Sequence, residues 1–366
     1  MVYVSFVLPC RNEEKTIGEC IDSIKLVFKK NKIDGEIIVS DSSIDRSTEI
    51  AKKKDVHLIE HNLNGYGIAC IEGMNVARGK YIFIADADGT YDFEEIPLFL
   101  NKIEQGYDIV LGSRLKGKIS KDAMPILHRY IGNPILSGLL NIFFKTGISD
   151  AHSGFRLIKK SSFKKLDLKT TGMEFASEMI IKAAKMNMKI SEIPINYRKR
   201  IGESKLSSFS DGWRHLRFML LFSPTYLFFI PGIFFLTVGF MYLLFDSLNL
   251  INIQNQNINL LFTFISSFLT ILGYQVLNLG LYSRIYATHT GFETHDDFIN
   301  IISNKLTLEK SLVIGVSIII FGFLLLSILL KEYTISRILL VLTILVIGFQ
   351  TLFSAFFISM MVIEKK

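Results

Sequence analysis

The sequence predicts an α/β domain with a mainly parallel, Rossmann-like sheet, followed by an all-α domain of four transmembrane helices. Short apolar runs alternate with helix-like stretches in the first half of the chain, and long uncharged apolar runs fill the second half. Such alternation is typical of a parallel sheet with helices on both faces. We therefore place the α/β domain at residues 1–206, an amphipathic helix at 207–225 and the membrane domain at 226–366.

Charge is divided in the same way along the chain. Residues 1–217 hold 34 of the 41 Lys and Arg and 27 of the 34 Asp and Glu, a net charge of +7, and residues 218–366 hold seven of each. Four apolar stretches in the second half are long enough to cross a bilayer, at residues 226–245, 260–283, 311–330 and 338–363. Four such stretches in succession favour membrane spans over buried soluble helices.

The basic residues predict how these spans are oriented. Residues 246–259 contain no Lys or Arg, whereas Arg284, Lys305 and Lys310 lie in the next loop. Basic loops tend to stay on the cytoplasmic side of a membrane. We expect a multi-pass protein of the cell membrane whose α/β domain and both termini are cytoplasmic.

The α/β domain contains five runs that we predict as strands and four that we predict as helices. The strands are expected at 2–8, 36–40, 56–60, 80–85 and 108–112, and the helices at 13–29, 47–54, 67–77 and 93–105. In a sheet of this kind, ligands bind beyond the carboxyl ends of the strands. The polar residues that follow the strands are therefore candidates for one site: Pro9, Arg11, Asn12, Glu13, Asp41, Asp45, Asp86, Asp88, Ser113 and Arg114.

Asp86 and Asp88 stand one residue apart after the fourth predicted strand. Two like charges this close are unfavourable without a positive charge between them. The sequence has no G-x-G-x-x-G after the first strand, which excludes the common site for a redox dinucleotide. It also has no G-x-x-x-x-G-K-[ST], which excludes a P-loop. Closely spaced carboxylates suit Mg²⁺ or Mn²⁺, an ion that also binds phosphate oxygens and neutralises a departing diphosphate. We therefore predict a metal ion that carries a nucleotide diphosphate.

Six ordered motifs resemble the family 2 glycosyltransferases with the GT-A fold: VLPCRNEEKTI, VSDSSIDRST, FIADADGTYDFEEIP, IVLGSR, SDAHSGFRLI and INYRKRIGESKL. More narrowly they resemble dolichyl-phosphate mannose and glucose synthases and bacterial polyprenyl-phosphate relatives, over about residues 2–206. The resemblance implies an inverting enzyme at the cytoplasmic membrane face. It would move a hexosyl unit from GDP-mannose, UDP-glucose or UDP-GlcNAc to dolichyl or polyprenyl phosphate, and no nucleic-acid partner is expected.

The resemblance also implies roles for individual residues. It puts Pro9, Arg11 and Glu13 at the nucleotide, Asp41 at its base or ribose, Asp86 and Ala87 along the diphosphate, and Asp88 on the metal, with Asp86 as a second metal candidate. At two places the sequence departs from the family pattern. Ser40 replaces one of two adjacent aspartates, and Gly89-Thr90 replaces Leu-Gln after D-A-D.

A lipid acceptor is also suggested by two apolar segments that are too short to span a bilayer, at 126–144 and 209–222. In the second, Phe209, Trp213, Leu216 and Leu220 share one helical face, which is typical of a helix lying in the membrane interface or of an ordinary core helix. A phosphate monoester has a second pKa near 6, so such an acceptor needs no strong general base. The residues expected to bind its phosphate are Arg114, Arg129, Arg200 and Lys205, and those expected to be catalytic are Asp86, Asp88, Arg114 and Arg129.

Two other functions compete with this interpretation. A processive polysaccharide synthase would share the α/β domain but is expected to carry the motif Q-x-x-R-W. The most similar residues in this sequence are Trp213-Arg214, which do not match this motif. A lipid-linked sugar flippase with a nucleotide-binding domain would be favoured by charges within the spans. The four predicted spans contain no charged residue.

Overall fold

The computed structural model describes residues 2–202, 208–289, 307–329 and 334–362. The chain divides into two compact units, Met1–Phe222 and Ser223–Lys366. The first unit is an α/β domain and the second is all-α, as the sequence predicts.

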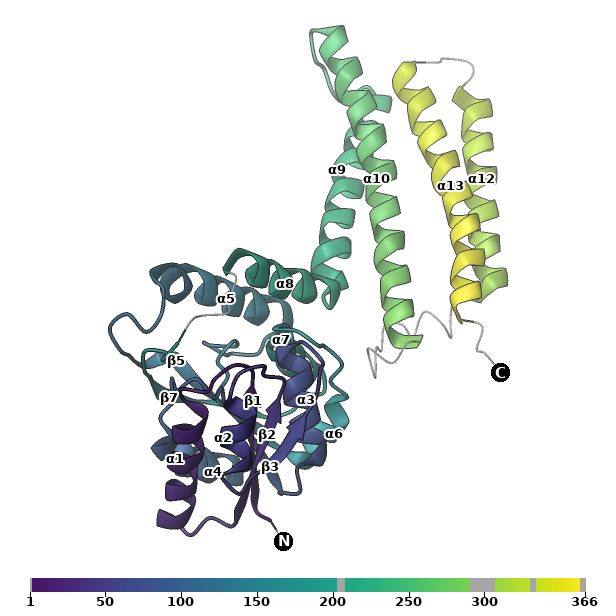
Figure 1. Cartoon of the computed structure of the whole chain (residues 1–366). Helices are drawn as coiled ribbons and strands as arrows, with labels where there is room; N and C mark the ends of the chain where they lie inside the picture. Colours follow the sequence, from purple (N-terminus) through teal and green to yellow (C-terminus); the bar gives the residue numbers. More distant parts are fainter. Residues whose placement is uncertain (1, 203–207, 290–306, 330–333, 363–366) are drawn as a thin grey trace. The chain divides into compact units, whose positions relative to one another are not determined.

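A seven-stranded sheet with the order β3-β2-β1-β4-β6-β5-β7 forms the centre of the first unit (Figure 1). β6 is antiparallel to both of its neighbours and every other pair is parallel. The strands are β1 (Val4–Cys10), β2 (Gly35–Asp41), β3 (His57–Glu60), β4 (Tyr81–Ile84), β5 (Ile109–Ile119), β6 (Arg156–Lys159) and β7 (Ile190–Tyr197). The predicted mainly parallel sheet is therefore confirmed.

Helices cover both faces of this sheet, because each buries one apolar stripe against it. In α1 the residues Ile17, Ile21, Ile24 and Phe28 recur at helical spacing and are all buried. One apolar cluster lies under α1 and α4, and a second under α3 and α7 (Figure 1). The helices are α1 (Ile17–Lys30), α2 (Ser47–Lys52), α3 (Tyr66–Val76), a 3₁₀ turn η1 (Phe93–Glu95), α4 (Ile96–Glu104), α6 (Lys160–Leu166) and α7 (Phe175–Lys185).

Two strands were not predicted from the sequence, β6 and β7. β6 has only four residues, which is too short a run to show a period. β7 contains Pro194, a residue that argues against a central strand but is tolerated at an edge, and β7 is an edge strand here. Both strands matter because they carry the SDAHSGFR and INYRKR segments to the sheet.

The apolar segment predicted at 126–144 forms a π-helical turn η2 (His128–Gly132) that runs into α5 (Asn133–Phe144). α8 (Ser208–Leu221) packs against α5 and α7. The protein-facing side of α8 is His215 and Met219, whereas Trp213 on the predicted apolar face is half-exposed. The large apolar side chains left exposed around η2 and α5 are Ile126, Leu127, Tyr130, Ile131, Ile135 and Ile142.

The second unit contains four helices that are long and apolar enough to cross a membrane, at 225–247, 256–288, 308–328 and 335–361 among the described residues. They correspond to a π-helical turn η3 (Thr225–Phe229) with α9 (Ile230–Ser247), and to α10 (Gln256–His289), α12 (Leu308–Leu329) and α13 (Ile335–Val362). α9 packs against α10, and α12 against α13 (Figure 1). Each of the four predicted apolar stretches thus falls on one of these helices, and most of the helices are longer than the stretches.

The first predicted span, 226–245, contains no charged residue, but α9 continues to Ser247 and so includes Asp246. The Asp246 carboxylate is buried and accepts hydrogen bonds from Asn259 (3.0 Å) and Thr263 (2.7 Å) of α10. A prediction from hydropathy ends a helix where the apolar residues stop. The real helix can continue through a polar residue when that side chain hydrogen-bonds to a neighbouring helix. Asp246 thus ties α9 to α10.

A buried ion pair joins β5 to the loop before β6. Arg114 donates to Asp150 through Nε and Nη2, both at 2.8 Å, and through its backbone N–H at 3.0 Å. Arg114 is 8% exposed and Asp150 is fully buried. Burial alone would raise the pKa of Asp150, but the Arg114 guanidinium and its hydrogen bonds outweigh burial and hold that pKa below its ordinary value.

We expect Asp150→Ala to destabilise the first unit by about 3 to 5 kcal/mol at pH 7, because it leaves the Arg114 charge buried without its partner. Because the pKa of Asp150 is lower in the folded state than its unfolded value of 3.8, ionised Asp150 stabilises the fold at pH values above 3.8. This stabilisation is lost as the pH falls below 3.8. Denaturant unfolding of the full chain in detergent at pH 7 and at pH 3 measures both effects.

The control is Asp22→Ala, which removes an exposed ion pair with Lys54 and should cost less than about 1 kcal/mol. If Asp150→Ala unfolded at the same denaturant midpoint as the unmodified protein at pH 7, the Arg114–Asp150 pair would have no structural role. If the difference in free energy of unfolding between Asp150→Ala and the unmodified protein did not decrease from pH 7 to pH 3, the Arg114–Asp150 interaction would not be ionic.

Candidate active site

Asp86 and Asp88 emerge at the carboxyl end of β4, where Asp88 is buried and Asp86 is half-buried. Burial, followed by the neighbouring Asp88 charge, raises the pKa of Asp86 to about 6. The two carboxylates therefore lie close enough to affect each other, as the sequence predicts. Their combined negative charge needs compensation from elsewhere in the fold.

Arg200 supplies positive charge at this point. Its Nη1 donates to Asp88 Oδ2 at 3.0 Å, and its Nη2 donates to the Glu13 carboxylate. The other oxygen of Asp88 accepts from the Thr90 hydroxyl at 2.6 Å and from the Thr90 backbone N–H at 3.1 Å. Arg200 was grouped from the sequence with the acceptor-phosphate residues, and its side chain lies within the carboxylate cluster. Its Nε is buried and has no hydrogen-bond partner among the described residues.

The other candidate donor-binding residues come to the same edge through two loops that follow β1 and β2. Glu13 N–H donates to Ser47 Oγ at 2.8 Å, and the loop is closed further by a bond from the Thr16 hydroxyl to the Ala87 carbonyl at 2.6 Å. Pro9 is buried near the end of β1, and Arg11 is exposed just beyond it. The structure thus brings Pro9, Arg11, Glu13, Asp86, Ala87 and Asp88 to one edge of the sheet.

Asp41 lies at the end of β2 but its carboxylate is engaged within its own loop. One oxygen accepts from the Ser43 N–H and hydroxyl, and the other from the Thr48 hydroxyl. Asp41 is 2% exposed. A nucleotide base at Asp41 would therefore have to replace one of these local hydrogen bonds. The neighbouring Ser40, where the family has a second aspartate, has its hydroxyl 3.2 Å from His61 Nε2.

The remaining acceptor-phosphate candidates are Arg114, Arg129 and Lys205, of which the structure places Arg114 and Arg129 on different elements. Arg114 is held by Asp150 and lies over the Tyr197 ring, at 5.3 Å from its centroid. Arg129 lies in η2, half-buried, over the Tyr130 ring at 5.2 Å. Lys205 lies outside the described residues. Arg114 and Arg129 are therefore on separate elements from Arg200, and no hydrogen bond in the described part of the chain joins them to Asp86 or Asp88.

A metal ion here would have few protein ligands. Among the described residues, no three His, Cys, Asp or Glu side chains converge on one point. Two carboxylates fit Mg²⁺ or Mn²⁺, because such ions commonly take one or two carboxylates and complete their shell with water and substrate phosphates. The donor set thus suits an ion that arrives with a diphosphate better than a permanently enclosed ion.

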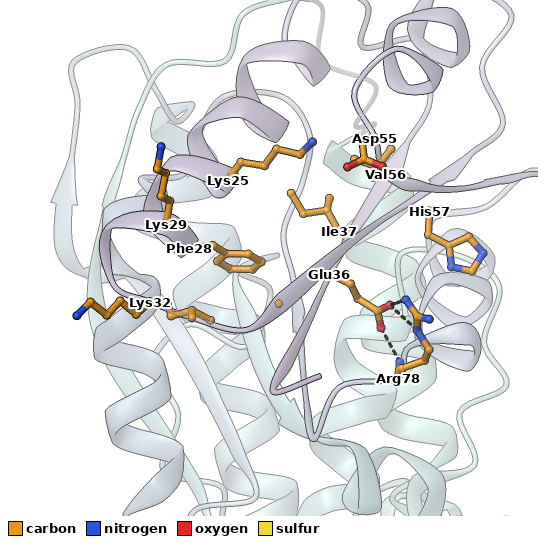
Figure 2. Close-up of a pocket in the computed structure, with 12 residues that line it drawn as sticks. Lys25, Phe28, Lys29, Lys32, Glu36, Ile37, Asp55, Val56, His57 and Arg78 are labelled. Atoms are coloured by element: carbon orange, nitrogen blue, oxygen red, sulfur yellow. Dashed lines mark hydrogen bonds and ion pairs between the residues drawn. The ribbon is translucent and has the colours of Figure 1, made fainter. Parts of the chain in front are cut away.

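The groove of about 640 Å³ shown in Figure 2 lies elsewhere. It is lined by Lys25, Lys29, Glu36 and Arg78, with Phe28 at its floor, around the amino end of β2. Asp41, at the other end of β2, marks the opposite edge of the sheet. This basic groove is therefore not the site that contains Asp86 and Asp88.

The residues of the site that were missed from the sequence include Tyr91 and Gly154. The Tyr91 hydroxyl donates to Asp86 Oδ2 at 3.3 Å and accepts from Gly154 N–H at 2.8 Å. Tyr91 stands within the DADGTYDF segment, and Gly154 within SDAHSGFR. Nothing in their spacing indicates contact, because 63 positions of chain separate them.

Comparison with known proteins shows the family to which the chain belongs. The Glycosyl transferase family 2 model matches residues 5–167, and the model of the glycosyltransferase family 2 C-terminal transmembrane region matches residues 281–362. The low-salt glycan biosynthesis hexosyltransferase Agl6 of Haloferax volcanii is 39% identical over 87% of this chain and 77% of its own length. A dolichyl-phosphate hexose transferase of the same organism is 32% identical over 57% of this chain and 89% of its own length.

A dolichyl-phosphate beta-glucosyltransferase of Dictyostelium discoideum is 28% identical over 57% of this chain and 70% of its own length. The resemblance suggested by the six motifs is thereby confirmed at the level of the family. With its GT-A sheet, its paired carboxylates at the carboxyl edge and its four apolar helices, the chain belongs to glycosyltransferase family 2 and is a membrane-bound glycosyltransferase.

Proposed function

We propose that this enzyme transfers a single hexosyl unit from a nucleotide diphosphate sugar to dolichyl or another polyprenyl phosphate, with inversion at the anomeric carbon. The observation that carries the proposal is the Asp86–Asp88 pair, which faces Arg200 and Glu13 at the carboxyl edge of the sheet. The names of the relatives from Haloferax and Dictyostelium support a hexose donor and a lipid phosphate acceptor.

On the donor side, Asp88 and Asp86 would hold Mg²⁺ or Mn²⁺, and Pro9, Arg11, Glu13, Asp41 and Ala87 would contact the nucleotide and its diphosphate. The ion, when bound, supplies charge that stabilises the leaving diphosphate. Arg200 is 24% exposed at its side chain and is held only by carboxylates in the described structure. Its guanidinium can therefore exchange a carboxylate for a phosphate oxygen, since both accept the same planar pair of N–H groups.

On the acceptor side, the attacking group would be a phosphate oxygen that is already ionised near neutral pH. It forms the new bond to the anomeric carbon as the bond to the nucleotide diphosphate breaks. The chain's task is then to bring two negatively charged groups together. We assign this task to the cationic residues Arg114, Arg129, Arg200 and Lys205, of which Arg114 is fixed by Asp150.

The exposed apolar residues of η2, α5 and α8 support a membrane-facing surface on the first unit. Ile126, Tyr130, Ile135 and Trp213 are each more than half exposed, which is costly in water. Trp and Tyr are enriched where protein meets the interface of a bilayer. A lipid phosphate lying in that interface would reach Arg129, which is carried by η2 between these apolar side chains.

The purified full-length enzyme with a polyprenyl phosphate and a panel of radiolabelled UDP and GDP sugars tests the proposed function. We expect one donor to yield a lipid product carrying a single sugar, with turnover that requires Mg²⁺ or Mn²⁺ and is lost in Asp88→Asn. A polymeric product would indicate a processive synthase instead. If the protein moved preformed lipid-linked sugar from one leaflet of a vesicle membrane to the other but transferred no sugar to the lipid phosphate, it would be a flippase.

Arg129→Ala should lower kcat/KM for the lipid by about ten- to a hundredfold, the equivalent of one hydrogen bond to a charged group. Donor affinity, measured by calorimetry, should stay unchanged. Arg78→Ala, which removes a guanidinium from the opposite edge of the sheet, is the control. Equal loss of donor binding and transfer in Arg129→Ala, or no loss at all, would exclude an acceptor role.

We further propose that the catalytic unit and both termini are cytoplasmic. Cysteine replacing Asn255, between α9 and α10, should react with an impermeant thiol reagent added outside intact cells. Cysteine replacing Thr307, at the start of α12, should react only after permeabilisation. The three native cysteines are buried and give a low background. Labelling of the Thr307 variant alone in intact cells would invert this topology.

A further inference from the structure

The Tyr91 hydroxyl contacts one of the paired carboxylates, and the proposed reaction leaves its role open. Tyr91 is 3% exposed, and its ring is stacked on Phe155 with centroids 4.9 Å apart and planes 10° apart. It also meets Tyr197 edge-on at 5.6 Å. These two contacts fix the ring, so the position of its hydroxyl is determined by the core and not by solvent.

The direction of the hydrogen bonds at this hydroxyl follows from its partners. The Gly154 backbone N–H can only donate, so the Tyr91 oxygen accepts that bond at 2.8 Å. The hydroxyl proton is then left for Asp86 Oδ2, at 3.3 Å. Burial and the Asp86 charge raise the pKa of Tyr91 well above its ordinary value, which keeps that proton in place.

Sheet register explains why Gly154 lies beside Asp86. β4 and β6 are antiparallel, with Ile84 opposite Arg156. Continuing this register by two residues places position 154 opposite position 86. A Cβ on Gly154 would lie 2.4 Å from Asp86 Oδ2 and 2.9 Å from its Cγ, so only glycine allows the carboxylate to occupy this position. Asp86 is therefore clamped between the Tyr91 hydroxyl and the Gly154 backbone.

The loop that contains Gly154 also reaches the second cationic residue of the site. Asp150, four residues earlier, makes the bidentate pair with Arg114. Arg156, two residues later, is buried and donates to the carbonyls of Ser153, Ala176 and Ala151, which fixes the loop at its end. One rigid loop thus contacts the donor-side carboxylate and the arginine expected on the acceptor side.

We propose that Tyr91 is a positioning residue which, together with Gly154, orients the Asp86 carboxylate toward the metal ion of a nucleotide diphosphate. The inference rests on the proposed function, because it assumes that Asp86 meets such an ion. Tyr91 touches neither substrate nor ion in this role. It acts by holding the Asp86 carboxylate at the angle needed to bind the ion, and it links that angle to the loop whose Asp150 pairs with Arg114.

The test uses Mn²⁺ with UDP and with GDP as probes, in calorimetry on the full chain in detergent. For each protein, nucleotide affinity is measured in Mn²⁺ and in EDTA, and the ratio of the two is the Mn²⁺-dependent gain. In Tyr91→Phe, which keeps the stacked ring, this gain should fall about tenfold, as for one hydrogen bond to a charged group. Affinity in EDTA should change less than about twofold. Gly154→Ala should show the same pattern with a larger loss.

The control is Tyr3→Phe, which removes a hydroxyl bonded to Glu104 at the opposite edge of the sheet and should leave the gain unchanged. A gain in Tyr91→Phe equal to that of the unmodified protein would overturn the inference. So would an equal loss of affinity with and without Mn²⁺, since general loosening of the fold acts on both. If Tyr91→Phe fails to fold, Gly154→Ala decides by the same two criteria. An unmodified protein that binds neither nucleotide would instead refute the proposed function itself.

Discussion

The crowding of two carboxylates at the end of β4 is the constraint on which the rest of the site depends. Asp86 and Asp88 repel each other in a buried setting, and burial raises the energy of each charged form. The fold answers with Arg200 and Thr90 on Asp88 and with Tyr91 on Asp86. In the proposed function, these carboxylates would bind the metal ion and Arg200 would exchange a carboxylate for a phosphate oxygen of the nucleotide diphosphate.

A second buried charge pair stabilises the neighbouring part of the fold and also connects it to the site. Arg114 and Asp150 are both buried and satisfy each other through two side-chain hydrogen bonds. Such a pair contributes less net stability than its Coulomb energy suggests, but losing one member is costly. Since Asp150 shares its loop with Gly154, the geometry of Arg114 and the geometry of Asp86 are set by the same short segment.

Much of the architecture follows from local sequence signals. The first five strands, the four intervening helices and the four spans each have an apolar run of adequate length and period. β6 and β7 lack this signal, because one is short and the other is an edge strand that contains Pro194. The end of the first span was predicted two residues before the end of α9. Asp246 lies in the last turn of α9, where Asn259 and Thr263 of α10 donate hydrogen bonds to its carboxylate.

The fold class, and the edge of the sheet at which Asp86 and Asp88 lie, follow from the sequence alone. These depend on residues close together in the chain and on the rule that parallel strands present their carboxyl ends to one edge. Only the tertiary structure decided which distant side chains complete the site. Asp88 and Arg200 are 112 positions apart, and Tyr91 and Gly154 are 63 apart. Tyr91 meets Gly154 because antiparallel β6 pairs with β4. Arg200 reaches Asp88 because the segment that follows β7 pairs with residues 88–91, and no local period encodes either pairing.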